Sequence, residues 1–227
     1  MITVHHLETS RSQRVLWLLE ELGVPYEIKL YQRDSRTRLA PPELKAVHPL
    51  GKSPVITDGK ETIAESGAIL EYLVERFGAK AQGKLGHLQP APGTPEHRQA
   101  RFWMHYAEGS LMNWLVMKLV FTTIPKQTPL VVRPLARQLC AKVQAKLIDP
   151  NLATALTFIE SHLANHVWFA GDHISIADFQ MSFPVEAALA RTASAAKFPF
   201  LAAYKARMVA RPAYQRALAK GGPVVMT

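Results

Sequence analysis

The chain has 227 residues, 48% hydrophobic and 20% charged, with a formal net charge of +9, so it suits one large or two modest globular domains. The single cysteine excludes a disulfide framework, and no apolar run approaches the roughly 18 residues of a membrane span, so we expect a cytoplasmic protein without a membrane partner. The basic residues are scattered and lack interleaved aromatic residues, a pattern typical of a solvated surface rather than a nucleic-acid site.

The first third of the chain begins with a β-α-β pattern. Residues 2–7 and 26–31 have the apolar spacing of strands, and residues 11–22 have one apolar helical face that Gly23 closes. A crossover helix between two short strands predicts that the strands pair in parallel, with a right-handed connection.

Two further strands and a helix complete this region. After a short helix that starts near Pro41, residues 55–57 and 62–63 read as strands joined through Asp58-Gly59, which is a strong hairpin signal. A helix over residues 65–77 follows. The order β-α-β-β-β-α predicts a thioredoxin-like domain over residues 1–80.

The sequence of the second half of the chain predicts a domain of a different class. Residues 81–95 are rich in glycine and proline and are expected to form a linker. From residue 96 to 227 the pattern is all-helical. The expected helices span residues 96–121, 134–148, 151–166, 175–191 and 200–218. The predicted fold class is therefore an α/β domain followed by an all-α domain.

One helix start in the second half is explicit. Ser175 and Asp178 have the spacing of a capping box, and Ile174 and Phe179 have that of a hydrophobic staple. We therefore interpret Asp178 as a residue that fixes the start of a buried helix and not as a catalytic acid.

A proline-headed strand is the first candidate site. Pro54 precedes a β-branched run, and proline lacks a ladder donor, so it belongs at the start of a strand. If the Ser53-Pro54 bond is cis, the Ser53 backbone faces outward and can pair with an extended peptide. A thioredoxin-like sheet edge holds small peptides in this way.

The helix start at Glu65-Ser66 is the second candidate. The first N–H groups of a helix lack partners and attract anions, so Ser66 can bind a carboxylate while Glu65 holds an ammonium group. Together they would receive both charged ends of an α-amino acid. Alternatively, Ser66 only caps the helix and Glu65 only complements its dipole.

These motifs carry a family resemblance. Residues 51–55 (GKSPV), 65–69 (ESGAI) and 9–15 (TSRSQRV) resemble, in order and spacing, the glutathione-binding domain of cytosolic glutathione transferases. The Ser-x-x-Asp box resembles that in the core helix of the family's C-terminal domain. The Ser-Arg start of the first helix is similar to a microbial, serine-type branch. The resemblance implies that the glutathione thiolate is conjugated to a small apolar electrophile.

A hydroxyl at the first helix is the expected thiolate partner. The free thiol has a pKa above neutral, and one hydrogen bond donated to sulfur favours the charged form. The resemblance assigns this role to Ser10, with Thr9 as the alternative because related serines differ by one position. Either residue could instead be a plain helix cap. The chain has no tyrosine here, and Cys140 is far off in sequence.

The resemblance also implies the contacts to glutathione. Lys52 would meet the glycyl carboxylate, the Ser53 backbone the cysteinyl residue, and Glu65 with Ser66 the γ-glutamyl end. His48 is a further candidate for a polar contact. Glutathione acts as a co-substrate, and no other cofactor is expected.

Aromatic residues and Met112 are candidates for the electrophile pocket. Trp103, Tyr106, Met112 and Trp114 follow one another at helical spacing, which is more often typical of a plain core. The nine histidines show no metal-binding spacing, so no metal site is expected.

Other functions remain open at this stage. The same fold also serves as a non-catalytic interaction module, and related enzymes act as peroxidases, isomerases or dehalogenases. The resemblance further implies a two-fold homodimer.

Overall fold

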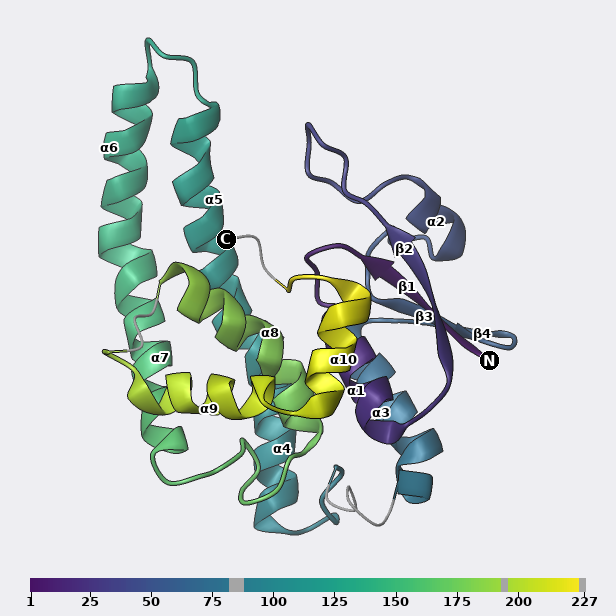
Figure 1. The fold of residues 1–227 in the computed structure, drawn as a ribbon. Helices are drawn as coiled ribbons and strands as arrows, with labels where there is room; N and C mark the ends of the chain where they lie inside the picture. Colours follow the sequence, from purple (N-terminus) through teal and green to yellow (C-terminus); the bar gives the residue numbers. More distant parts are fainter. Residues whose placement is uncertain (82–87, 193–195, 225–227) are drawn as a thin grey trace.

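The computed structural model describes residues 1–81, 88–192 and 196–224. It consists of a mixed sheet with flanking helices, followed by a helical domain (Figure 1), which confirms the predicted fold class. Much of the expected linker, residues 82–87, lies outside the described residues.

The sheet belongs to the first domain. Its strands run in the order β2-β1-β3-β4. The parallel pair of β1 and β2 and the antiparallel hairpin of β3 and β4 are as predicted, and β1 also pairs with β3 in an antiparallel register. The elements of this domain are β1 (Ile2–Leu7), α1 (Gln13–Leu22), β2 (Tyr26–Tyr31), α2 (Glu43–Val47), β3 (Val55–Asp58), β4 (Glu61–Ala64), α3 (Ser66–Phe77) and the 3₁₀ turn η1 (Gly78–Ala81).

The described residues of the helical domain form two long helical runs and three further helices. Each run contains a π-helical turn, so the helix expected over 96–121 is α4, η2 and α5 in succession. The elements are α4 (Pro95–Tyr106), η2 (Ala107–Leu111), α5 (Met112–Gln127), α6 (Arg133–Val143), η3 (Gln144–Ile148), α7 (Asp149–Leu163), α8 (Ile176–Arg191), α9 (Pro199–Val209) and α10 (Pro212–Gly221).

The prediction of a single helix over residues 200–218 is wrong. The structure divides it into α9 and α10, and α10 begins at Pro212. Proline at the first helical position has no N–H to donate to the preceding turn, and its ring disfavours the helical conformation of Arg211, whose ψ is 129°. A new helix therefore starts there in a new direction.

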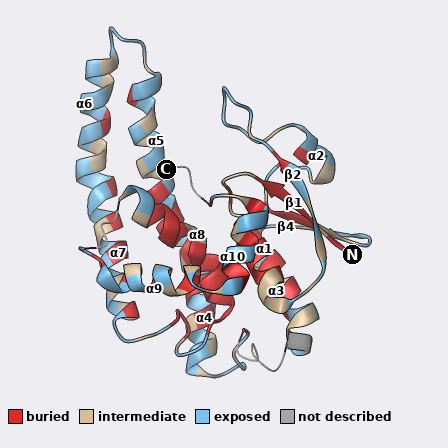
Figure 2. Ribbon diagram, viewed as in Figure 1, coloured by how far each residue is buried: buried red, intermediate tan, exposed pale blue. Residues whose placement is uncertain are grey.

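Helix α1 lies between the sheet and the helical domain and is shared by both cores. Trp17 is fully buried, with its ring 4.4 Å from that of Phe179 on α8 and 5.4 Å from that of Tyr214 on α10. Figure 2 shows the buried residues concentrated where α1, α8 and α10 meet. The two domains thus form one packed unit around the first helix.

The start of α8 confirms the structural interpretation of Asp178. Its fully buried carboxylate accepts hydrogen bonds from the Ser175 N–H (2.8 Å), the Ser175 hydroxyl (3.1 Å) and the Phe169 N–H (3.0 Å). Burial raises its pKa to about 6, although these donors act in the opposite direction.

No helix within the described ranges is both long enough and apolar enough to cross a bilayer.

Candidate functional site

The sheet register brings the two motifs around Pro54 and Ser66 together. Val55 on β3 pairs with Ala64 on β4 in an antiparallel register. Pro54 and Glu65 are the next residues outward on the two strands, so they lie side by side at one edge of the sheet. The Ser53-Pro54 bond is cis.

Ser53 is fixed to the end of β1. Its hydroxyl donates to the His5 carbonyl (2.9 Å) and accepts from the Leu7 N–H (3.2 Å). Because β1 runs antiparallel to β3, Leu7 lies at the same sheet edge as Pro54. The turn from Leu7 into α1 therefore joins the other two motifs there.

This turn contains both candidate hydroxyls, in different environments. The Ser10 hydroxyl is buried; it donates to the Leu7 carbonyl (2.7 Å) and lies 2.7 Å from the Ser12 hydroxyl. It also accepts from the Ser12 N–H (3.2 Å). Thr9 is half-buried, with φ at 45°, which is exceptional for a β-branched residue. No hydrogen bond joins the Thr9 hydroxyl to another described residue.

Ser66 is tied to both domains. Its hydroxyl accepts from Nη1 of Arg14 on α1 (2.9 Å) and lies 3.2 Å from Oε1 of Gln180 on α8, to which it donates. Glu65, and not Ser66, occupies the N-cap position of α3, with φ at 72° and an exposed side chain. Ser66 thus supplies the first N–H of the helix while its hydroxyl is held in place.

An arginine pair and a carboxylate complete the cluster. Nη1 of Arg14 lies 2.6 Å from Oε1 of Glu108, and Nε of Arg11 lies 2.9 Å from the same oxygen. Glu108 belongs to the π-helical turn η2, and such turns frequently occur at functional sites. The guanidinium groups of both arginines also lie over the ring of Phe183 on α8.

The electrostatics of this cluster leave Arg14 and Glu108 charged at neutral pH. Burial lowers the pKa of Arg14 to about 10, against the opposing effect of Glu108. Burial raises the pKa of Glu108, but the charges and hydrogen bonds of Arg14 and Arg11 outweigh this and hold it below its usual range. Nε and Nη2 of Arg14 find no acceptor among the described residues. The cluster therefore has more donors than acceptors.

Sequence reasoning missed Arg11, Arg14, Glu108 and Gln180. One signal was present for Arg14, which is a charged residue within the otherwise apolar face of the predicted first helix. Nothing local marked Glu108 or Gln180, because both meet Arg14 or Ser66 only through the packing of the two domains.

A cavity of about 550 Å³ lies beside this cluster, between the start of α1 and α5. Met112 and Trp114, two of the predicted pocket residues, line it, together with Arg11, Glu108 and Val116. Its charged groups thus come from the cluster, and its apolar side chains come from α5.

The structure does not bring the other two predicted pocket residues to this cavity. Trp103 is fully buried, with its ring 4.8 Å from that of Phe169 and 5.4 Å from that of Phe158. Tyr106 stacks on Phe102 at 5.4 Å. Both belong to an aromatic cluster, which corresponds to the plain-core alternative.

Lys52 and His48 lie in the loop that leads to Ser53. Lys52 is exposed, and His48 is half-buried, with Nδ1 accepting from the Leu50 N–H (3.4 Å). Their loop joins α2 to β3 beside the cis proline.

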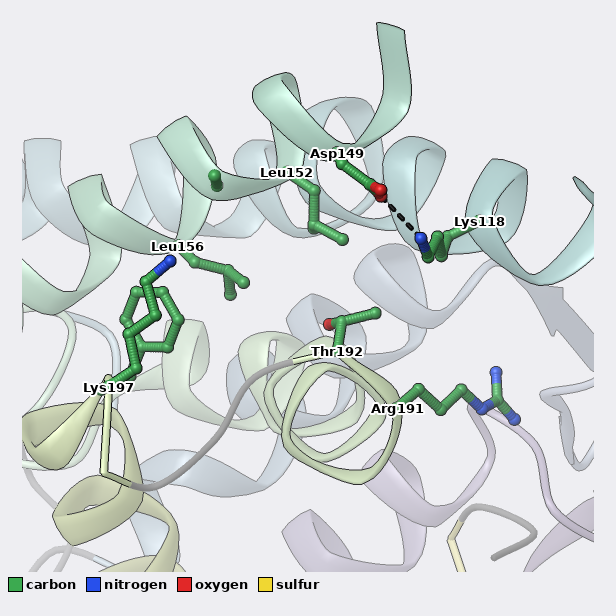
Figure 3. Close-up of a pocket in the computed structure, with 9 residues that line it drawn as sticks. Lys118, Asp149, Leu152, Leu156, Arg191, Thr192 and Lys197 are labelled. Carbon is green, nitrogen blue, oxygen red and sulfur yellow. Dashed lines mark hydrogen bonds and ion pairs between the residues drawn. The ribbon is translucent and has the colours of Figure 1, made fainter. Parts of the chain in front are cut away.

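A separate cavity of about 360 Å³ lies between α5, α7 and the end of α8 (Figure 3). Lys118 and Asp149 form an ion pair at its rim (2.7 Å), and Leu152 and Leu156 contribute apolar walls. None of the predicted site residues lines it. Residues 1–81, 88–192 and 196–224 contain no group of three potential metal ligands.

Comparison with known proteins identifies both domains. Residues 1–75 match the family model "Glutathione S-transferase, N-terminal domain" and residues 114–212 match "Glutathione S-transferase, C-terminal domain". "Glutathione S-transferase 3" of Schizosaccharomyces pombe is 40% identical over 190 residues, covering 83% of this chain and 74% of the relative.

Solved structures share the fold. A glutathione S-transferase from Actinobacillus pleuropneumoniae has a TM-score of 0.77 and 30% identity, covering 97% of this chain and 93% of that one. A family member from Pseudomonas fluorescens, solved with two glutathione molecules bound, has a TM-score of 0.71 and 25% identity, covering 96% and 92%. The chain belongs to the glutathione S-transferase family.

Proposed function

We propose that this protein binds glutathione at the edge formed by Ser53-Pro54 and Glu65-Ser66 and transfers its thiolate to a small apolar electrophile in the adjacent cavity. The observation that carries the proposal is the convergence of three sequence motifs with a cavity of about 550 Å³ at one end of the sheet. The glutathione bound to the Pseudomonas fluorescens relative supports the same co-substrate.

The charges at this edge suit the tripeptide. The exposed Glu65 carboxylate complements the γ-glutamyl ammonium group, and the first N–H groups of α3 complement its carboxylate. The exposed Lys52 supplies a positive charge for the glycyl carboxylate. The unmatched donors of Arg14 add positive potential behind Ser66.

For the thiolate, we propose that Thr9 donates the hydrogen bond and that Ser10 holds the turn. The Ser10 hydroxyl already has its donor and acceptor capacity engaged within the turn. Thr9 is more exposed, and its positive φ is a strained conformation of the kind that occurs at functional sites. The cavity begins two residues away, at Arg11.

We also propose a cytoplasmic homodimer that removes reactive electrophiles. Exposed apolar side chains on α4, α5 and α7, such as Phe102, Val116 and Phe158, support pairing of two copies. Sedimentation at micromolar concentration is expected to show twice the chain mass of 25.3 kDa. A species of only 25.3 kDa would contradict the dimer.

The test of function has two stages. The protein is expected to be retained on immobilised glutathione and to be eluted by free glutathione, and then to conjugate glutathione to a generic aryl halide. Retention without turnover of that or any other electrophile would replace conjugation by isomerase, peroxidase or dehalogenase activity. Absence of retention would indicate an interaction module.

A further inference from the structure

The hairpin formed by α5 and α6 has an unusual charge pattern. Between Glu108 and Asp149 the sequence has no acidic residue over 40 positions, while six basic residues occur there. These contribute +6 of the formal net charge of +9. The basic residues are Lys118, Lys126, Arg133, Arg137, Lys142 and Lys146.

The tip of this hairpin is apolar and exposed. Leu130 is 75% exposed, Val131 92% and Val132 49%. Figure 1 shows the tip projecting beyond the rest of the helical domain, and Figure 2 shows its surroundings to be largely exposed. Three consecutive apolar residues at the most protruding point of a domain are not explained by its own core.

Hydrogen bonds hold the loop at this tip in a defined conformation. Arg133 donates to the carbonyl of Thr128 through Nε (3.2 Å) and Nη2 (3.1 Å), and its backbone N–H donates to the Pro129 carbonyl (3.0 Å). The Thr128 hydroxyl donates to the Ile124 carbonyl (2.8 Å). These bonds close the connection between the two helices and present the three apolar side chains outward.

Positive charge surrounds the tip. Lys126 lies in the last turn of α5, Arg133 starts α6, and Arg137 lies about 6 Å further along the axis of α6. This places three positive charges within roughly a Debye length of any surface that the tip touches. Neither Lys126 nor Arg137 forms an ion pair with another residue in the described parts of the chain.

We propose that the α5–α6 tip docks on an anionic lipid bilayer, with Leu130 and Val131 inserted among the headgroups and the basic residues on lipid phosphates and carboxylates. Apolar insertion and charge attraction to anionic lipids add together in surface binding. This surface docking differs from membrane spanning, for which no helix among the described residues is long and apolar enough. It also revises the sequence-based expectation that the protein has no membrane partner.

The chemistry of the tip disfavours other occupants. A second copy that paired tip to tip across a two-fold axis would bring two acid-free, basic hairpins together, and like charges repel. A nucleic acid requires positive charge at the centre of its site, whereas the centre of this tip is apolar.

The test is flotation with vesicles of phosphatidylcholine containing 30% phosphatidylserine, compared with pure phosphatidylcholine. The wild type is expected to float with the anionic vesicles only and to be released by high salt. Val131→Asp is expected to lower the partition coefficient at least tenfold, and Lys126→Gln about fivefold. Leu39→Asp, at a residue 65% exposed in the first domain, and Lys60→Gln are the matched controls and are expected to bind as the wild type does.

Three results would overturn the proposal. The first is that the wild type does not float with the anionic vesicles, or that it floats equally well with the neutral vesicles. Another is flotation that Leu39→Asp or Lys60→Gln weakens as much as the tip variants do. The third is a Val131→Asp variant that changes the sedimenting mass without lipid yet keeps wild-type flotation, since this would assign the tip to a second copy. Circular dichroism of each variant checks that the fold is retained.

Discussion

Nη1 of Arg14 lies 2.6 Å from Oε1 of Glu108, and this contact joins the first helix of the N-terminal domain to the π-helical turn of the helical domain. The same nitrogen lies 2.9 Å from the Ser66 hydroxyl. One fully buried guanidinium therefore connects the start of α3 with the wall of the cavity. The site exists only when both domains are packed.

We predict that Glu108→Gln lowers the free energy of unfolding by about 1 to 3 kcal/mol, because it leaves the buried Arg14 charge without a counter-charge. Urea denaturation measures the change. The exposed pair of Lys118 and Asp149 is the matched control, and Asp149→Asn is expected to change stability by less than about 1 kcal/mol. Equal effects of the two substitutions would contradict a special role of the pair between Arg14 and Glu108.

We predict that Glu65→Gln and Ser66→Ala each weaken glutathione binding by about 1 to 3 kcal/mol. The first removes the counter-charge of the ligand ammonium group, and the second removes a hydroxyl held by Arg14 and Gln180. Titration calorimetry with glutathione measures both. Glu61→Gln, at an exposed position of β4, is expected to leave the affinity unchanged. Wild-type affinity in both site variants would place glutathione elsewhere.

We predict that Thr9→Val raises the pKa of the bound glutathione thiol and moves the pH–rate profile to higher pH, with little change in glutathione affinity. A tenfold change in the acid dissociation constant of the thiol corresponds to about 1.4 kcal/mol of thiolate stabilisation. Ser10→Ala is expected to lower the melting temperature, because it opens the turn held by the Leu7 carbonyl and Ser12, and to leave the thiol pKa unchanged. The reverse result would assign the thiolate to Ser10.

We predict that Glu186→Gln flattens the pH dependence of stability between about pH 4.5 and 8. Burial raises the pKa of Glu186 from 4.5 to about 7, although the hydrogen bond from Tyr214 (2.6 Å) opposes this. The folded state therefore keeps a proton that the unfolded chain releases. Its contribution is present below about pH 4.5 and is lost as the pH rises through 7, on the order of 3 kcal/mol. Parallel stability curves for the two proteins would contradict this.

The motifs around Pro54 and Glu65-Ser66 could be predicted from the sequence, because the backbone conformation of each depends on its own residues. Pro54 must start a strand, Glu65-Ser66 must open a helix, and the register of a hairpin then places them side by side. Glu108 was not predictable, because it meets Arg14 across 94 positions of sequence.

The π-helical turn also explains why only some of the predicted pocket residues line the cavity. Eleven residues are about three turns of a regular α-helix, so Trp103 and Trp114 would share a face. The wider turn of η2 lies between them and rotates α5 relative to α4. Trp103 therefore faces the core and Trp114 the cavity, which helical spacing alone cannot distinguish.

The position of α10 against α1 has a consequence for synthesis on the ribosome. Trp17 packs on Tyr214, and His6 forms a hydrogen bond with the Gly221 carbonyl (2.8 Å). Glu20 forms ion pairs with Arg216 and Lys220 of α10, and Glu21 pairs with Arg211, which precedes α10. The partner of the first helix is thus translated roughly 200 residues later, about 10 to 40 seconds at ordinary rates. During that interval the nascent N-terminal domain presents the Trp17 face of α1 to solvent, without its α10 partner. A chaperone that shields apolar helices has its longest opportunity there.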